Sequence, residues 1–362
     1  MDVDSPITGP IQLTDYTLDG LTELVESWGE KPFRAKQLWR WIHVKLATDI
    51  HEMTDLAKVF RARLDGVIAP LRPEIREHRV SSDGTEKWLL TLADGEAIEM
   101  VFIPEESRGT LCISSQVGCT LNCPFCHTGV QGFSRNLEVH EIVQQVLLAR
   151  DQLSQRDKNI TNLVLMGMGE PLYNETNVVT AVQIVMNRNG LAFGNRKVTL
   201  STAGVLPAMA RVGEALGVNL AISLHSVRDE VRDTLVPLNR KYNLAALRKA
   251  ALAYPLRGKK RITWEYVMLK GVNDSLEDAR LFARYLRGIP SKINLIPFNP
   301  WPGSHYEATP MDRVHAFQNV LHNAGYVTVV RDRRGSDIEA ACGQLKGVVV
   351  GAKPRKQRPA SS

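Results

Sequence analysis

Three cysteines stand close together directly after the first strand predicted for the core. Cys119, Cys123 and Cys126 form a C-x3-C-x2-C pattern within VGCTLNCPFCHTG. Three thiols this close cannot all pair as disulfides, so a metal centre is the better interpretation. With His127 they could form a Cys3His zinc site, although a histidine adjacent to Cys126 would struggle to reach the same tetrahedron. The pattern favours a [4Fe–4S] cluster held by three cysteines, whose fourth iron stays open to chelate a substrate.

Two further cysteines lie far from this group in the sequence. Cys112 falls in the predicted strand TLCISSQ, and Cys342 falls in SDIEAACGQL near the end of the chain. A lone cysteine among small residues is most often a buried, alanine-like thiol. Glu99 lies between Ile98 and Met100 on an alternating strand, where a single glutamate is most often solvated. Taken alone, these three residues indicate no particular chemistry.

The composition is that of an ordinary globular protein. Of the 362 residues, 44% are hydrophobic and 23% are charged, and no apolar run approaches the roughly 20 residues of a membrane span. The first residues, MDVDSPITGP, lack the basic and apolar regions of a secretory signal. Five cysteines without an export signal fit a reducing compartment, so we expect a cytoplasmic protein with no membrane partner. The net charge of +6 permits a nucleic-acid partner without requiring one.

The elements that must position these residues change in type along the chain. The first 75 residues carry apolar residues at helical spacing, for example Leu38, Trp41 and Ile42, and the segment around Asp94-Gly95 alternates as a β-hairpin does. From about residue 110, strands and helices alternate, with strands predicted at TLCISSQ, NLVLMGMG, KVTLSTAG, NLAISLHS, RITWEYVML, KINLIPFN and YVTVVRD. This alternation predicts an α/β fold with a parallel sheet, either a partial or complete barrel or a doubly wound sheet.

These patterns divide the chain into four parts. We expect a helical N-terminal domain at 1–75, a β-hairpin linker at 76–104, a core at 105–350 that includes the Cys342 loop, and a basic tail at 351–362. The Pro/Ser-rich composition of the tail predicts disorder.

Several small or polar residues stand where the core strands are predicted to end, which is where parallel α/β folds gather their chemistry. They are Gly169, Glu170, Ser201, Ser223, Leu224, His225 and Asn299. Each could have an ordinary role, with Glu170 as a charge at a helix N-terminus and the two serines as caps. Their shared position at successive strand ends strengthens the case for function.

The cysteine pattern, with the aromatic Phe125 before its last cysteine, resembles the signature of the radical SAM superfamily. The resemblance implies a partial (β/α)6 barrel and a [4Fe–4S] cluster on Cys119, Cys123 and Cys126. It also implies S-adenosylmethionine on the open iron, cleaved by one electron to a 5′-deoxyadenosyl radical. The strand-end residues from Gly169 to Asn299 would then contact S-adenosylmethionine.

Longer segments narrow the resemblance. SSQVGCTLNCPFCHTGVQGFSRNL, VLMGMGEPLYN, NLIPFNPWPGS and RRGSDIEAACGQL are similar to the RlmN/Cfr family of RNA adenine methyltransferases, over essentially the whole chain. Within this family, the wording is more similar to the members that methylate C2. This resemblance implies methylation at C2 of an adenine in 23S rRNA and in the tRNA anticodon loop, with a flavodoxin-type reductant. Methylation at C8, the other activity of the family, uses the same residues and stays open. A non-catalytic iron–sulfur RNA-binding protein is the alternative from a different class.

The family resemblance also assigns the isolated residues. Cys342 matches the cysteine that takes a methyl group from one S-adenosylmethionine, and a second S-adenosylmethionine provides the radical that activates this methyl group. The resulting methylene radical adds to adenine C2, an electrophilic carbon without a lone pair for polar methyl transfer. Cys112 matches the cysteine that then forms a transient disulfide with Cys342. Glu99 matches the assigned proton acceptor, although Cys112 itself could serve as the base.

Basic and aromatic residues alternate in the segment KPFRAKQLWRWIHVK. They are Lys31, Arg34, Lys36, Arg40 and Lys45, interleaved with Phe33, Trp39 and Trp41. The segment could be a phosphate-binding face with stacking rings, or an ordinary amphipathic helix with tryptophan in the core. RDRRG at 331–335 would place positive charge beside the reacting base, and the basic tail would add sequence-independent attraction for RNA.

Overall fold

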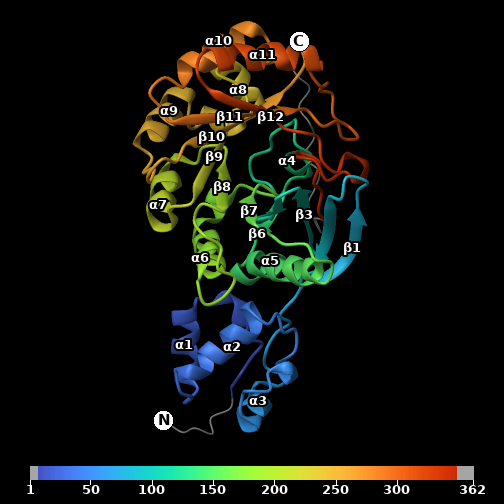
Figure 1. The fold of residues 1–362 in the computed structure, drawn as a ribbon, viewed down its shortest axis with the longest axis vertical. Coiled ribbons are helices and arrows are strands. Elements are labelled where there is room, and N and C mark those ends of the chain that lie inside the picture. The colour runs from blue at the N-terminus through green and yellow to red at the C-terminus, as the bar shows by residue number, and fades with distance from the viewer. Residues whose placement is uncertain (1–6, 349–362) are drawn as a thin grey trace.

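The computed structural model describes residues 7–348 and divides them between a helical end and an α/β core (Figure 1). The helical end has η1 (Leu13–Asp15), α1 (Leu18–Ser27), α2 (Phe33–His43), η2 (Ile50–Glu52) and α3 (Lys58–Leu64). Leu38 and Ile42 of α2 are fully buried, as their spacing predicts. Helices α1 to α3 gather at the bottom of Figure 1, below α5. Asp15 joins them to the core by accepting from the backbone N–H of His140 on α5 at 2.7 Å.

One sheet dominates the described part of the chain, with its ten strands in the order β1-β2-β3-β4-β7-β8-β9-β10-β11-β12. The strands are β1 (Glu74–Val80), β2 (Glu86–Thr91), β3 (Ala97–Glu105), β4 (Arg108–Cys112), β7 (Asn162–Leu165), β8 (Val198–Thr202), β9 (Asn219–Ser223), β10 (Ile262–Met268), β11 (Ser291–Pro297) and β12 (Val327–Val330). Neighbours pair antiparallel from β1 to β4 and parallel from β4 to β12. The parallel strands therefore bring their carboxyl ends to one edge.

Helices connect the parallel strands. They are α5 (Val139–Ser154), η3 (Pro171–Asn174), α6 (Glu175–Met186), α7 (Leu206–Leu216), α8 (Asp229–Leu235), η4 (Pro237–Arg240), α9 (Leu244–Ala253), α10 (Leu276–Tyr285) and α11 (Met311–Asn323). Between β4 and α5 lie β5 (Gln116–Gly118), α4 (His127–Gln131) and β6 (Phe133–Asn136), and η5 (Ser336–Ile338) follows β12. All seven residues of β10 are buried, as expected for a strand covered on both faces. The prediction of an incomplete βα barrel is confirmed.

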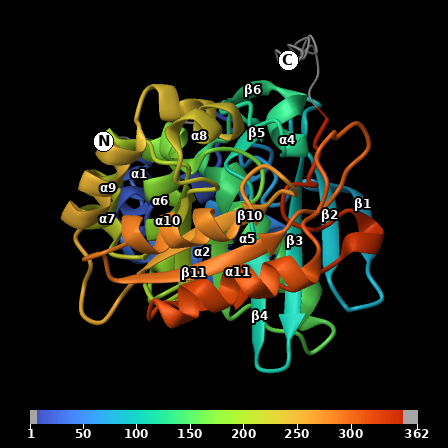
Figure 2. The same ribbon diagram turned by 90° about the horizontal axis from the view of Figure 1, so that it is seen from above.

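The predicted hairpin is confirmed at β2 and β3, whose turn contains Gly95 with a φ of +82°. Both strands continue the core sheet, because β3 pairs with β4. Figures 1 and 2 show β1 on one side of the molecule and α7 and α9 on the other. The domain limits at 75, 104 and 350 stay predictions, and the tail at 351–362 lies outside the described residues. No helix in residues 7–348 has the length and apolar character to cross a membrane.

Candidate active site

A cavity lies at the carboxyl ends of the parallel strands and collects most of the predicted site residues. Its lining includes Cys119, Cys123, Cys126, Gly169, Glu170, Ser201, Ser223, His225 and Cys342. Since these residues come from strand ends and loops spread between positions 119 and 342, the fold brings together what the sequence keeps apart.

The cysteine loop is held between the two strands of the β5–β6 hairpin. Gly118 has a φ of +73°, and a Cβ there would lie 1.9 Å from the carbonyl oxygen of Gly132. This close approach lets Cys119 donate its backbone N–H to the same oxygen at 2.8 Å. Burial raises the pKa of each cluster cysteine, to about 12 for Cys119. A bound cationic centre would favour the thiolate forms and displace these protons, so the three neighbouring thiols fit a metal cluster.

The zinc alternative lacks its fourth ligand. The His127 ring stacks on the Trp301 indole with centroids 4.7 Å apart and does not line the cavity. Among residues 7–348, no three His, Cys, Asp or Glu side chains are grouped to hold a single metal ion. Cysteines that hold a four-iron cluster bind different irons, so they need not converge on one point. The arrangement therefore fits the cluster better than zinc.

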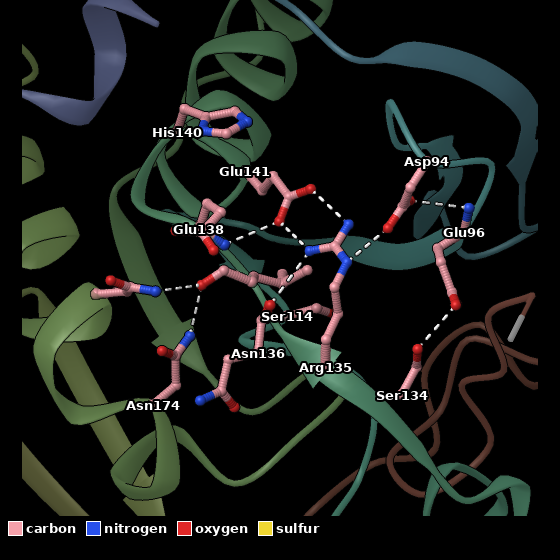
Figure 3. A network of polar contacts seen from close by, with 12 residues as sticks. Asp94, Glu96, Ser114, Ser134, Arg135, Asn136, Glu138, His140, Glu141 and Asn174 are labelled. Carbon is pink, nitrogen blue, oxygen red and sulfur yellow. Dashed lines mark hydrogen bonds and ion pairs between the residues drawn. The ribbon is translucent and has the colours of Figure 1, made fainter. Parts of the chain in front are cut away.

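A polar network ties the return strand of this hairpin to the rest of the core (Figure 3). Arg135 on β6 donates from Nε to Asp94 at 2.6 Å, and its two terminal nitrogens donate to Glu141 on α5 at 2.7 and 2.8 Å. The two-nitrogen pairing is the strong geometry for an arginine–carboxylate contact. Next to it, the Ser134 hydroxyl donates to Glu96 at 2.8 Å. The network fixes the position of the hairpin that carries the cysteines.

Gly169 and Glu170 follow β7 and form one wall of the cavity. The N–H groups of Leu172 and Ala203 donate to the two carboxylate oxygens of Glu170, at 3.1 and 2.8 Å. Burial raises the pKa of Glu170 to about 7, against these hydrogen bonds. Gly169 has a φ of +105°, and a Cβ there would approach the backbone N of Gln116 to 2.8 Å. The wall thus combines a position that only glycine suits with a buried carboxylate.

The ends of β8 and β9 supply further contacts. Ser201 and Ser223 line the cavity, and His225 accepts from the Val267 N–H at Nδ1, at 3.1 Å. Burial lowers the pKa of His225 to about 3, so its ring is neutral and carries its proton on Nε2. The Leu224 side chain lies fully buried in the core and does not line the cavity. We therefore expect Leu224 to support the site rather than to contact a ligand with its side chain.

Asn299, after β11, contacts the loop that carries Cys342. Its amide nitrogen donates to the Cys342 carbonyl at 3.2 Å, whereas its amide oxygen is buried without a hydrogen-bond partner. A buried acceptor left unpaired is costly unless a ligand satisfies it. Asn299 does not itself line the cavity, but it contacts Cys342, which does, so its contact with a bound molecule stays a prediction.

The two isolated cysteines lie near each other, and one of them lines the cavity. Cys342 is exposed and lines it, while Cys112 is buried at the end of β4. Burial, followed by the nearby Cys342 sulfur, raises the pKa of Cys112 to about 12. The Arg331 guanidinium also lines the cavity, and the Cys342 sulfur is the main cause that raises its pKa. The alternative of a buried core thiol agrees with the burial of Cys112 but not with Cys342, which is exposed.

Glu99 is not solvated, contrary to the expectation for a single glutamate on an alternating strand. It is 4% exposed, because residues near Cys342 cover that face of β3. Its Oε1 lies 3.0 Å from Lys87 Nζ, and its Oε2 accepts from the Lys346 N–H at 2.8 Å. Burial raises the pKa of Glu99, while Lys87 opposes the rise. A carboxylate in this setting is a stronger base than a solvated one.

Sequence reasoning missed two charged residues at the site. Lys87 reads as an ordinary polar position on a hairpin strand, and Glu265 lies within the buried strand β10. Glu265 lines the cavity, and its buried Oε2 has no hydrogen-bond partner but forms a long ion pair with Arg331 at 4.0 Å. The one signal that could have identified them is a charged side chain at a strand position that the surrounding sequence predicts to be buried.

The predicted RNA face on α2 is smaller than the sequence implies. Trp39 is 1% exposed and packs in the core, as the amphipathic-helix alternative predicts. Phe33 is 47% exposed, and Lys45 Nζ lies 3.3 Å from the centroid of the partly buried Trp41 ring. Phe33 and Trp41 are therefore the rings on this helix that reach the surface.

The barrel and its cysteine-lined cavity define a radical SAM enzyme, and comparisons with known proteins agree. The radical SAM superfamily model matches residues 113–283, and the N-terminal domain model of ribosomal RNA large subunit methyltransferases matches residues 11–69. A solved radical SAM methyltransferase from Sphaerobacter thermophilus is 40% identical with a TM-score of 0.89, covering 93% of this chain and 99% of that one.

Curated relatives narrow the assignment. The dual-specificity RNA methyltransferase RlmN of Magnetococcus marinus is 66% identical, over 95% of this chain and 97% of its own. That of Rhodospirillum rubrum is 50% identical, over 93% and 80%. The chain belongs to the RlmN family of radical SAM RNA methyltransferases, whose cofactors are a [4Fe–4S] cluster and S-adenosylmethionine.

Proposed function

We propose that the protein methylates C2 of an adenine in 23S rRNA and in the tRNA anticodon loop, through a methyl group carried by Cys342. The observation that carries the proposal is the shared cavity. Cys342 lines it together with all three cluster cysteines, and Cys112 lies beside it. A methyl carrier must reach both the cofactor and the base, and a thiol on a loop at the cavity meets this need.

Cys119, Cys123 and Cys126 would hold the cluster. When bound, the [4Fe–4S] cluster and S-adenosylmethionine supply the radical chemistry that an electrophilic ring carbon requires. Glu170, whose carboxylate is buried at the cavity, would accept from the cofactor's ammonium group. The remaining polar contacts would come from Ser201, Ser223, the Nε2–H of His225 and the unpaired amide oxygen of Asn299.

The backbone around Cys342 presents the thiol. The Cys342 carbonyl accepts from Asn299, and the Gly343 carbonyl accepts from the His127 N–H at 2.7 Å. Gly343 has a φ of +83°, which glycine adopts without strain. The loop is thus held by its backbone while the sulfur stays exposed to accept a methyl group.

Cys112 and Glu99 would complete the reaction. The covalent adduct between Cys342 and the base, formed by addition of a radical, would return one electron to the bound cluster, and Glu99 would take the proton from its C2. The Cys112 thiolate then attacks the Cys342 sulfur, and the bond from that sulfur to the methylene carbon breaks with its electron pair passing to the carbon. This carbon takes up a proton and becomes the methyl group. The Cys342 sulfur lies near enough to help raise the pKa of the Cys112 thiol, which supports a disulfide between the two residues.

RNA would be bound by the helical end, where the aromatic rings of Phe33 and Trp41 reach the surface, and by Arg331, which lines the cavity. The target adenine must leave its stack to enter the cavity. A flavodoxin-type reductant and a cytoplasmic location complete the proposal.

Nucleoside mass spectrometry tests the proposal directly. RNA treated with the reduced enzyme should gain 2-methyladenosine, and the Cys342→Ala variant with an intact cluster should yield none. The Cys112→Ala variant should accumulate a covalent adduct with RNA. Formation of 8-methyladenosine instead would establish the other activity of the family. Wild-type methylation rates in both variants would refute the roles of the two cysteines.

A further inference from the structure

A buried lysine on β2 contacts both Glu99 and the Cys342 loop (residues 339–346). Lys87 Nζ lies 3.0 Å from Glu99 Oε1 and donates to the Glu339 carbonyl at 3.1 Å. The Lys87 and Glu99 side chains are each 5% exposed. A charged pair taken out of water contributes little net stability, so its presence here calls for another reason.

The Glu99 carboxylate reaches the other arm of the loop. Its Oε2 accepts from the Lys346 N–H at 2.8 Å, and the side chains of Lys346 and Glu339 pair at 3.1 Å. The Lys87–Glu99 pair therefore holds the loop on both sides of Cys342, at Glu339 before it and at Lys346 after it.

Resting on the proposed function, we infer that Lys87 is a positioning residue for the proton-transfer step. Lys87 keeps Glu99 ionised until Glu99 accepts a proton from the base. Glu99 then has no negative charge, its contacts with the Cys342 loop weaken, and the loop can move before the disulfide forms. The proton passes from adenine C2 to a Glu99 oxygen, and the electron pair of the C–H bond stays on the base. A neutral carboxyl no longer pairs with Lys87 and is a weaker acceptor for the Lys346 N–H.

Other charged groups around the pair come from three elements. Lys346 and Glu339 face it from the loop, Arg79 from β1 and His127 from α4. Among all of these groups, Lys87 does most to oppose the rise that burial causes in the pKa of Glu99. Removal of the Lys87 charge should therefore leave Glu99 protonated over a wider range of pH.

The test is the pH profile of proton loss from adenine C2 in a single turnover, followed with C2-deuterated RNA in the Cys112→Ala background, where the pH-dependent disulfide step is absent. Below the pKa of the base the rate falls with pH, and in Lys87→Met this acid limb should move up by about one to three pH units. On this acid limb, the rate in Lys87→Met should be at least about tenfold lower than in the wild type at the same pH. At higher pH the two rates should become equal. Lys87→Arg keeps the charge and should return the limb to its wild-type position.

Lys158→Met is the matched control. Lys158 pairs at 2.8 Å with Glu86, the buried neighbour of Lys87 on β2, and its loss should leave the limb in place. The fraction of Cys342 that is S-methylated, measured by peptide mass spectrometry, should equal that of the wild type in every variant. Lys87→Gln serves the same comparison if Lys87→Met does not fold.

An unmoved limb in Lys87→Met, or a shift that Lys87→Arg does not reverse, would overturn the inference. Loss of Cys342 methylation in Lys87→Met would also overturn it, because Lys87 would then act in building the loop. Failure of the proposed function has a different signature, since the wild-type enzyme itself would leave adenine C2 unmethylated.

Discussion

The wall of the cavity at Gly169 offers a sharp test of how backbone geometry serves cofactor binding. Gly169→Ala adds one methyl group at a φ of +105°, where its carbon would lie 2.6 Å from Gln116 Cβ and 2.8 Å from the Gln116 backbone N. The Gln116 amide oxygen also accepts from the Glu170 N–H at 3.0 Å. Relief of the clash must therefore displace the residue that orients Glu170.

The magnitude follows from two separate contributions. A left-handed conformation costs an L-residue about 1–2 kcal/mol, and insertion of a carbon against fixed neighbours costs about 1–3 kcal/mol more. Gly325→Ala isolates the first contribution, because Gly325 has a φ of +89° with nothing within 4 Å of the added carbon. The two variants should thus differ in the free energy of unfolding by about 1–3 kcal/mol.

Anaerobic thermal unfolding and equilibrium dialysis with S-adenosylmethionine measure the two consequences. The Tm of Gly169→Ala should lie roughly 2 °C or more below that of Gly325→Ala. The Kd of Gly169→Ala for S-adenosylmethionine should rise, because the displaced Glu170 binds the cofactor less well. Each 1.4 kcal/mol of lost binding free energy raises the Kd about tenfold. Gly325→Ala should bind S-adenosylmethionine as the wild type does. Equal Tm values and an unchanged Kd in Gly169→Ala would refute the reasoning.

Three further predictions address charge, reactivity and the cluster. Glu170→Gln keeps the shape of the side chain but loses its charge, so dialysis should show weaker binding of S-adenosylmethionine, and unchanged binding would contradict the assigned contact. Because burial raises the pKa of Cys112 to about 12, its alkylation in cluster-loaded Cys342→Ala should rise about tenfold per pH unit from neutral pH upward. Peptide mass spectrometry checks this, and a rate that levels off near neutral pH would speak against a protonated thiol. Arg135→Leu leaves Glu141 without its two-nitrogen partner. The cluster should then lose its visible absorbance to a chelator faster than in the wild type, and equal loss rates would show that the network does not hold the hairpin.

Much of the fold could be predicted because its signals are local. The helices at residues 18–27 and 33–43 coincide with apolar residues at helical spacing, and each of the seven core strands coincides with a short apolar segment. The order of parallel strands then places their ends at one edge, which brought Glu170, Ser201 and His225 to the cavity. Trp39 and Trp41 show the limit of local signals, because only the fold decides which ring is buried.

Glu99 shows why the rest could not be predicted. An alternating strand implies one face in the core and one in water only if nothing else covers the second face. Here a segment from the far end of the chain covers it, and Ala97 and Val348 exchange both of their backbone hydrogen bonds across the junction. That cover carries Cys342, so the same long-range contact that buries Glu99 also places it against the loop of that cysteine. A buried charge on a strand face that should be solvated is therefore itself evidence of a covering segment, and here Lys87 and Glu99 both contact that segment, at Glu339 and at Lys346.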